Sequence, residues 1–365
     1  MIRRYLPRST EELISWYERY ISPFSLLVGF TIDNLAIRQI DLWLSSLVLA
    51  GYLSLAAIGT ILINLVGSGR LRHQVALTVA PFIPVVVQFA FGGLFSGFVI
   101  LYSRSAAIAV SWVFVVLLAA LLLGNERFRT FYTRFPFQIG ILFFGLLSFM
   151  IFYVPFITKT IGPWMFVISG AVSVTLIALY LYISSFYIRE LVKETRTTVA
   201  RTIAGIFFFI MILYFLGAIP PLPLSLRDVG VLHSIQRTGD TYAVTYESRT
   251  WYEMYFRYKQ VYHLAPGEVV YVYTAIFAPS GISTGIVHEW QKYDALKGSW
   301  VTEHVLTFPI QGGREGGYRG YSLKRDVSPG EWRVNVMTDY GQLIGRVGFR
   351  VEKVDAPVAL QSDKF

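Results

Sequence analysis

The stretch Gly217-Ala218-Ile219-Pro220-Pro221-Leu222-Pro223-Leu224 divides this chain into two parts of different character. Before it, long apolar runs are joined by short basic segments, and after it no apolar run is long enough to span a bilayer. Three prolines in four positions cannot continue a helix, because each lacks a backbone N–H and disfavours helix in the preceding residue. The stretch predicts a stiff connector between a membrane domain and a folded domain in water.

Composition supports a multi-span membrane protein. The 365 residues are 54% hydrophobic and only 15% charged, with a mean hydropathy of +0.52. Residues 1–224 contain 16 Lys and Arg against 8 Asp and Glu, whereas residues 225–365 contain 16 against 15, so the net charge of +9 belongs to the membrane part. The second part has no basic cluster that would indicate a nucleic-acid partner. The absence of cysteine excludes disulfides and thiolate metal sites.

Seven apolar segments precede the connector, and the first is marginal because it is short and carries Asp33 and Asn34. If all seven cross, one side of the membrane receives 13 basic residues and the other receives 3, as the positive-inside rule requires. If the first segment is re-entrant, the split falls to 9 against 7. We therefore expect seven spans, a cytoplasmic N-terminus and an extracytoplasmic C-terminal part. The segments are 21–37, 41–66, 75–101, 105–124, 136–158, 163–188 and 201–219.

Two polar residues inside the expected membrane region are candidates for function. Asp33 would be costly at depth unless paired or protonated, which favours proton or cation handling. The alternative is a charged hairpin at the outer interface, where Asp33, Arg38 and Asp41 satisfy one another and water. Gln88 follows two prolines, as in a broken helix that lines a transport site. The alternative there is close helix packing through Gly93-x-x-x-Gly97.

The second part reads as strands, from its period-two alternation and its turn residues. Nine short strands in about 130 residues predict an all-β antiparallel sandwich of immunoglobulin-like size. The expected strands are 229–237, 241–247, 250–259, 268–278, 284–292, 301–310, 317–325, 331–338 and 343–353. The expected organisation is an amphipathic segment (1–20), a transmembrane helical domain (21–219), a connector (220–226), a β-sandwich (227–355) and a flexible tail (356–365).

A set of motifs between Gly285 and Val351 resembles the bacterial family catalogued as domain of unknown function 2914. The resemblance implies a multi-pass protein of the bacterial inner membrane with this β domain, and it implies no activity, because the family has none established. Similar stretches in the membrane half are Phe24–Asp41, Phe89–Ser105 and Gly124–Phe128. The motifs are Ile286-Val287-His288-Glu289-Trp290, Tyr318-Arg319-Gly320-Tyr321-Ser322-Leu323-Lys324, Pro329-Gly330-Glu331-Trp332-Arg333-Val334, Thr338-Asp339-Tyr340-Gly341-Gln342-Leu343-Ile344-Gly345 and Phe349-Arg350-Val351.

The motif strands supply one candidate ligand site, with a histidine, a tryptophan and an arginine on neighbouring strands. Such a group suits a sugar or an anion, and the alternative is a buried, hydrogen-bonded histidine with the arginine paired to a carboxylate. No catalytic, metal or cofactor motif appears, which argues against an enzyme. The candidate residues are His288, Trp290, Arg319, Tyr321, Ser322 and Lys324.

The sequence leaves three functional hypotheses. The first is a non-enzymatic envelope protein whose partners are the lipid bilayer and, through the sandwich, a membrane or envelope protein or a glycan. The alternative is a transporter or intramembrane enzyme with the sandwich as a regulatory domain. A sensor is the third, although no expected cytoplasmic segment is long enough for an output domain. The oligomeric state is left open.

Overall fold

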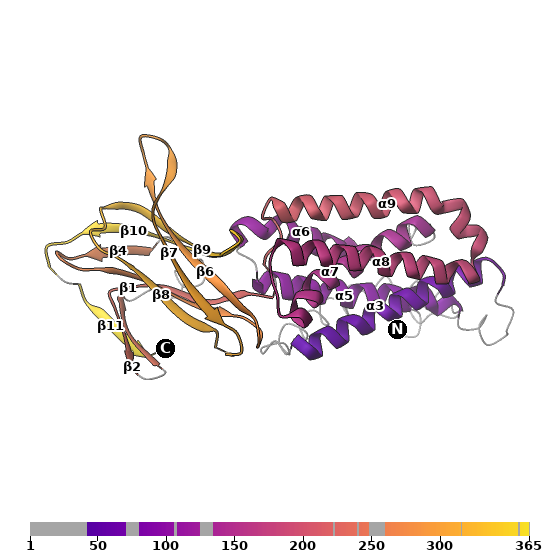
Figure 1. Ribbon diagram of the computed structural model, residues 1–365, viewed down its shortest axis with the longest axis horizontal. Helices are drawn as coiled ribbons and strands as arrows, with labels where there is room; N and C mark the ends of the chain where they lie inside the picture. Colours follow the sequence, from indigo (N-terminus) through magenta and orange to yellow (C-terminus); the bar gives the residue numbers. More distant parts are fainter. Residues whose placement is uncertain are drawn as a thin grey trace, which may run out of the picture. The chain divides into compact units, whose positions relative to one another are not determined.

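The computed structural model describes residues 42–70, 80–105, 108–124, 134–221, 223–238, 241–247, 260–314, 316–356 and 358–364. The chain forms a helical unit that ends at Ala218 and a β unit that begins at Ile219 and also includes Arg104–Trp112 and Phe156–Pro163. Figure 1 shows the helices in indigo to red and the strands in orange to yellow. The expected segments 1–20, 21–37 and 250–259, and with them Asp33, lie outside the described residues.

Six apolar helices are described, each matching one of the expected segments. Five are long and apolar enough to cross a membrane, and α6 is shorter, at 17 residues. The first expected span, 21–37, is outside the described residues, so the described chain provides six helices and not seven. The helices are α3 (Leu42–Gly67), α5 (Ile83–Ser105, preceded by the 3-10 turn η3, Ala80–Phe82), α6 (Ile108–Gly124), α7 (Phe135–Thr158), α8 (Pro163–Tyr187) and α9 (Arg189–Phe215).

Helix α9 begins earlier than the sequence predicts. The sequence places the basic residues from Arg189 to Arg201 in a loop before a span at 201–219, but the helix begins at Arg189 and has 27 residues. Lys and Arg are good helix formers, and Val192 and Val199 recur among them at helical spacing. Long basic side chains can also lie along a helix and keep their charges in water. The basic residues of low hydropathy therefore belong to the same continuous helix as the apolar residues that follow them.

Helix α7 is the most buried helix of its unit, with 83% of its most apolar window inside. Asn64 of α3 donates a hydrogen bond to Gln138 Oε1 of α7, at 2.6 Å. On α5, a Cβ at Gly93 would lie 2.5 Å from the Tyr52 ring, and one at Gly97 would lie 2.7 Å from Leu49. These glycines therefore let α3 and α5 approach closely, as the packing alternative predicts. Gln88 lies half-buried on α5.

The described residues of the β unit form three sheets. A five-stranded sheet has the order β4-β10-β9-β6-β7, a second sheet has the order β1-β5-β8, and a third has the order β11-β3-β2. All described pairs are antiparallel except β4 with β10, which are parallel. The strands are β1 (Ser225–Leu232), β2 (Ser234–Thr238), β3 (Thr241–Glu247), β4 (Gln260–Leu264), β5 (Val270–Phe277), β6 (Ser283–Asp294), β7 (Ser299–Gln311), β8 (Tyr318–Lys324), β9 (Gly330–Thr338), β10 (Leu343–Lys353) and β11 (Leu360–Lys364).

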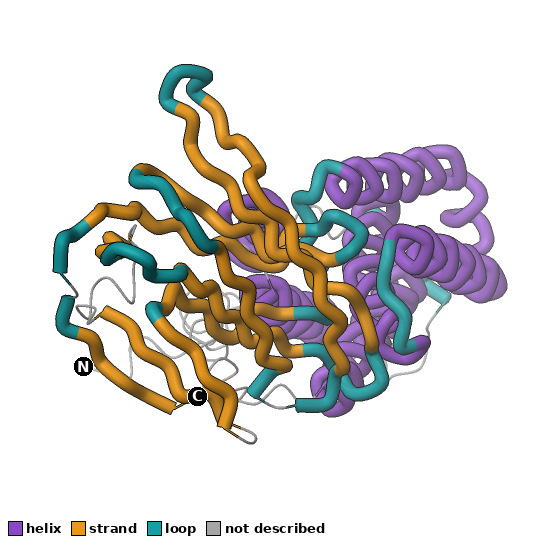
Figure 2. Tube along the Cα trace, turned by 60° about the vertical axis from the view of Figure 1, so that its left-hand side comes forward, coloured by secondary structure: helices purple, strands orange, loops and turns teal. Residues whose placement is uncertain are grey.

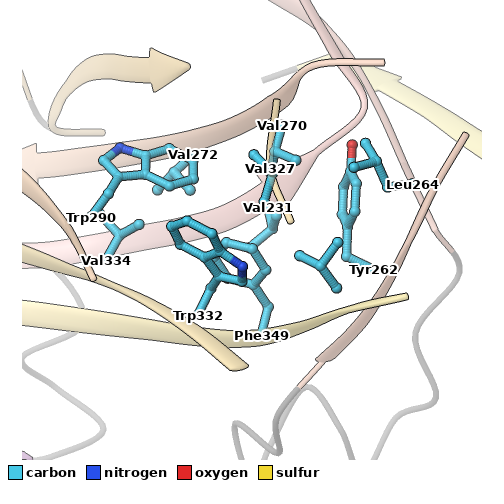
Figure 3. Packing of buried hydrophobic residues seen from close by; sticks show 11 residues of the cluster. Val231, Tyr262, Leu264, Val270, Val272, Trp290, Val327, Trp332, Val334 and Phe349 are labelled. Carbon is cyan, nitrogen blue, oxygen red and sulfur yellow. The ribbon is translucent and has the colours of Figure 1, made fainter. Parts of the chain in front are cut away.

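The main core lies between the five-stranded sheet and the β1-β5-β8 sheet (Figure 3). Trp290, Trp332 and Phe349 from one sheet meet Val270 and Val272 from the other. Alternation along each strand directs these side chains inward, so two facing sheets bury one continuous cluster. The cluster consists of Val231, Tyr262, Leu264, Val270, Val272, Trp290, Val327, Trp332, Val334, Phe349 and Val351.

The third sheet distinguishes this fold from the two-layer, immunoglobulin-like sandwich that the sequence predicts. Strand β5 is apolar on both faces, since buried Tyr273 and Ala275 alternate with Val272 and Ile276. A strand that is apolar on both faces needs cover on both sides. Ile235 of β2 and Val244 of β3 provide the second cover by packing on Tyr273 and Ala275.

The C-terminal residues form a strand where the sequence predicts a flexible tail. Strand β11 pairs with β3 from Leu360↔Glu247 to Lys364↔Ala243. All five of its residues are exposed, so the strand has no apolar alternation to reveal it. Pairing here rests on backbone hydrogen bonds, which composition does not report. The β unit therefore uses residues beyond 355.

Candidate functional site

Three of the six candidate residues meet inside the β unit. His288 and Trp290 on β6 are 0% exposed, and Ser322 on β8 is 1% exposed. His288 Nδ1 lies 2.8 Å from Ser322 Oγ, and Trp290 Nε1 donates to the same oxygen at 2.9 Å. These polar atoms therefore join the two facing sheets across the core.

The hydrogen-bond pattern assigns a protonation state to His288. Trp290 N–H can only donate, so the Ser322 hydroxyl accepts it and is left to donate to His288 Nδ1. On the other side, Nε2 lies 3.1 Å from Thr274 Oγ1, and that hydroxyl donates to the Gly320 carbonyl at 3.4 Å. A neutral imidazole with its proton on Nε2 satisfies every group in this chain.

Burial favours the same neutral state, because it lowers the pKa of His288 to about 4. The Phe308 ring contacts the imidazole edge-on, with ring centroids 5.0 Å apart. The buried position supports the structural interpretation of the His-x-Trp motif. These side chains hold the two sheets in register and have no open surface for a ligand.

The other three candidates lie elsewhere on β8. Arg319 and Tyr321 point to the opposite face from Ser322, and Tyr321 is 39% exposed beside Tyr242 and Tyr271. Lys324 points inward, with Nζ 5.7 Å from the centroid of the Trp332 ring. The structure therefore separates the single predicted site into a buried cluster, an outer tyrosine-rich surface and a lysine above the core.

A second group of polar residues, which the sequence analysis missed, lies on the outer face of the five-stranded sheet. Asn335 Nδ2 donates to Glu289 Oε2 at 2.8 Å, and Thr302 Oγ1 donates to Glu289 Oε1 at 2.7 Å. Burial opposes the ionised form of Glu289, but these donors outweigh it and lower the pKa of the carboxyl. We call this surface the polar face: Glu289, Gln291, Trp300, Thr302, Arg333, Asn335 and Arg346.

Two arginines dominate the polar face. Arg333 Nε donates to Gln291 Oε1 at 2.7 Å, and its guanidinium lies 4.3 Å from the centroid of the Trp300 ring. Arg346 Nε donates to Asn335 Oδ1 at 2.6 Å. Partial burial, together with the neighbouring Arg346 in the case of Arg333, lowers the pKa of both guanidinium groups. Within the described chain, no hydrogen bond occupies the terminal nitrogens of either arginine.

Period-two alternation would have revealed the polar face. Glu289 and Gln291 alternate with the buried His288 and Trp290 on β6, as Arg333 and Asn335 alternate with Trp332 and Val334 on β9. Register then aligns the two strands, with Glu289↔Asn335 and Gln291↔Arg333. The predicted ligand site drew mainly on the inward residues of β6, so it did not include these outward residues.

A third cluster joins the sheets at the end of β4. The Glu247 carboxylate lies 3.1 Å from His233 Nε2 and 2.7 Å from both His263 Nδ1 and the His263 amide. Burial disfavours the charged carboxylate, but these partners together lower the pKa of Glu247 to about 2. The described residues contain no group of three or more His, Asp or Glu suited to a metal ion. The cluster attaches β3 to β4 and the turn at His233.

A family model described as "Protein of unknown function (DUF2914)" matches residues 283–351, from β6 to β10, which confirms the resemblance over that region. The comparison with curated proteins finds no match. Among solved structures, the chain is similar to Pseudomonas fluorescens alkylpurine DNA glycosylase AlkC bound to DNA containing an abasic site analog. That likeness has 10% identity, covers 84% of this chain and 98% of that chain, and has a TM-score of 0.21. A score this low carries no argument about fold or function.

Proposed function

We propose that the protein is a non-enzymatic, multi-pass protein of the bacterial inner membrane that presents its β unit outside the cytoplasm to bind a partner. Five helices long and apolar enough to cross a membrane support the membrane assignment. The basic residues of the chain before Pro220 support the orientation, because they concentrate in alternate connections and, from Arg189 to Arg201, in the first half of α9. Binding of an envelope protein or a glycan is then the role of the β unit.

The observation that carries this proposal is the pair of arginines on the polar face. Arg333 and Arg346 contribute two positive charges, and Glu289 contributes one negative charge, so the cluster has an excess of one positive charge. Each guanidinium is fixed through Nε, which leaves its terminal N–H groups for a ligand. A guanidinium binds carboxylates through two parallel hydrogen bonds. The polar face therefore suits a carboxylate-bearing partner, such as an acidic glycan or an acidic protein segment.

The β6–β7 hairpin extends this surface. It is formed by the two longest strands of the β unit and projects beyond its neighbours (Figures 1 and 2). Leu296 at its tip is 100% exposed, and the tip is held by Asp294 Oδ1, which accepts the Leu296 amide at 2.9 Å. Tyr293 and Trp300, which pair next to the turn, form an edge contact with centroids 5.4 Å apart. Tyr, Trp and Arg are the side chains that most often dominate the binding energy of protein interfaces, and this surface contains all three.

The test is binding of the full-length protein in neutral detergent to immobilised polyuronate, to an acidic peptide and to a neutral glycan. We expect the double variant Arg333→Gln/Arg346→Gln to lose about 100-fold or more in affinity for the carboxylate ligand, because charge-assisted hydrogen bonds contribute about 1.5–3 kcal/mol each. Arg350→Gln is the matched control. Arg350 lies on β10, as Arg346 does, but its Nε donates a hydrogen bond to Glu331 Oε1 at 2.9 Å. The proposed site would be refuted if the unaltered protein, the double variant and Arg350→Gln bound the carboxylate ligand equally. It would also be refuted if the unaltered protein preferred the neutral glycan.

Orientation has its own test. A reporter that is active only in the cytoplasm, fused after Phe365, is expected to be silent, because seven crossings from a cytoplasmic N-terminus place the C-terminal part outside. A reporter that is active only in the periplasm, fused at the same position, is expected to be active. Cytoplasmic activity after Phe365 would mean an even number of crossings, with residues 21–37 re-entrant.

A further inference from the structure

A long groove runs along the seam between α8 and α9. Its volume is about 1200 Å³, and it is lined from Ala171 to Ser185 on α8 and from Arg189 to Phe208 on α9. Its most buried residues are Phe135, Ile177 and Val199, which are 1–3% exposed. Most of the lining is apolar, and one end is basic.

Packing of the same two helices explains the groove. Near the start of α8, a Cβ at Gly170 would lie 2.8 Å from the Phe207 ring and 2.9 Å from Met211, so the helices are in close contact there. The rings of Phe166 and Tyr214 stack in the same region, with centroids 3.6 Å apart. Further along, small side chains line both helices and leave the space unfilled. These are Ala171 and Ala178 on α8, and Ala200 and Ala204 on α9.

The basic end is built from one face of α9. Arg189, Lys193 and Arg196 follow one another at intervals of four and three residues, and all three line the groove. They are exposed, and none of their side chains forms an ion pair or hydrogen bond with any residue in the described ranges. The acidic residues of these turns, Glu190 and Glu194, are not part of the lining. The groove therefore holds three positive charges that no lining residue neutralises.

The dimensions match one leaflet of a bilayer. The apolar part on α9, from Val199 to Phe208, rises about 14 Å at 1.5 Å per residue. One leaflet contributes about 15 Å of hydrocarbon to a bilayer core. The basic part, Arg189 to Arg196, rises about 10 Å, which is enough to span a headgroup region of about 5–8 Å. A lipid with its phosphate at the basic end would lie with its acyl chains along the apolar end.

We propose that this groove binds an anionic phospholipid, with the headgroup phosphate held by Arg189, Lys193 and Arg196 and one acyl chain lying between α8 and α9. Charge complementarity selects an anionic headgroup, because a zwitterionic lipid adds no net charge to balance three cations. The apolar length selects a lipid over a free anion. This site is independent of the polar face and uses residues of the helical unit only.

The charge experiment uses full-length protein, purified and delipidated in neutral detergent, with bound lipid counted by native mass spectrometry. We expect phosphatidylglycerol to bind, phosphatidylcholine to bind weakly, and the triple variant Arg189→Gln/Lys193→Gln/Arg196→Gln to bind phosphatidylglycerol about 100-fold more weakly. Arg196→Gln alone is compared with Arg201→Gln, an exposed arginine of the same helix that does not line the groove. Equal binding by these two single variants would overturn the proposal.

A second pair of variants tests the apolar part without changing charge. Ala204→Leu fills the groove and is expected to weaken phosphatidylglycerol binding about tenfold, because the added side chain occupies the place of the acyl chain. Gly205→Leu is the control, since a Cβ there meets nothing within 4 Å and Gly205 is not in the lining. Unchanged binding by Ala204→Leu would overturn the proposal. So would full competition by inorganic phosphate, or a shift from dimer to monomer in the triple variant, which would identify a second copy as the occupant.

Discussion

Lowering the pH from 6.5 to 4.5 is expected to destabilise the β unit by about 2 kcal/mol through His288 alone. Burial holds the pKa of His288 at about 4 in the folded protein, whereas it is about 6.5 in an unfolded chain. The unfolded state therefore binds the extra proton between these values. The stability that depends on a neutral His288 is complete above pH 6.5 and is lost as the pH falls towards 4.

His288 and Glu247 lose their contributions to stability over different pH ranges. The folded pKa of Glu247, about 2, lies below its ordinary value, so the stability that it contributes is lost only below about pH 4.5. Hydrogen exchange of β6 and β8 amides in the full-length protein, corrected for intrinsic rates, measures the change. His288→Gln should reduce the slope of stability against pH between pH 6.5 and 4.5, and Glu247→Gln should leave that slope unchanged. A slope that persists unchanged in His288→Gln would show that His288 is not its source.

Replacing Trp290 by alanine is expected to lower the free energy of unfolding of the β unit by about 3–5 kcal/mol. Trp290 is fully buried in the central cluster, and its ring lies 6.1 Å from Phe349, edge to face. Its loss leaves a cavity between the facing sheets. It also removes the donor that fixes the Ser322 hydroxyl toward His288. Because a domain is stable by only about 5–15 kcal/mol, this change approaches the total.

Trp300→Ala is the matched control for Trp290→Ala. Trp300 lies on the neighbouring strand but on the outer face, where it packs against Arg333. We expect its loss to cost about 1 kcal/mol or less and to weaken binding at the polar face. Pulse proteolysis in urea on the full-length protein measures both variants. Equal destabilisation by the two would contradict the assignment of inner and outer faces.

The apolar helices were predictable from the length of their continuous apolar runs, and most strands were predictable because burial of one face leaves a period of two in the sequence. Segments 136–158 and 163–188 match α7 and α8 to within one residue. The predictions are wrong where apolar burial does not determine the structure. The basic start of α9 is helical although its charges lower the hydropathy, and β11 pairs through its backbone without an apolar face.

The candidate site was predictable only in part. His288, Trp290 and Ser322 do meet, because alternation correctly placed each on an inward face. Whether they reach a ligand depends on the sheet above them, and a single sequence does not report which sheets face each other. The α8–α9 groove was not predicted for a similar reason. Its basic residues lie on α9, in a region where the sequence predicts a loop.

The position of β10 has a consequence for the kinetics of folding. Its neighbours in the five-stranded sheet are β9, the preceding strand, and β4, whose Gln260 pairs with Phe349 far along the chain. Closing so long a loop is entropically costly, and folding slows as the sequence separation of contacts grows. Strand β4 therefore lacks its hydrogen-bonding neighbour until β10 has been synthesised. Until then the edge of β4 that will pair with β10 is open to other chains, and a factor that shields it would raise the yield of folded protein.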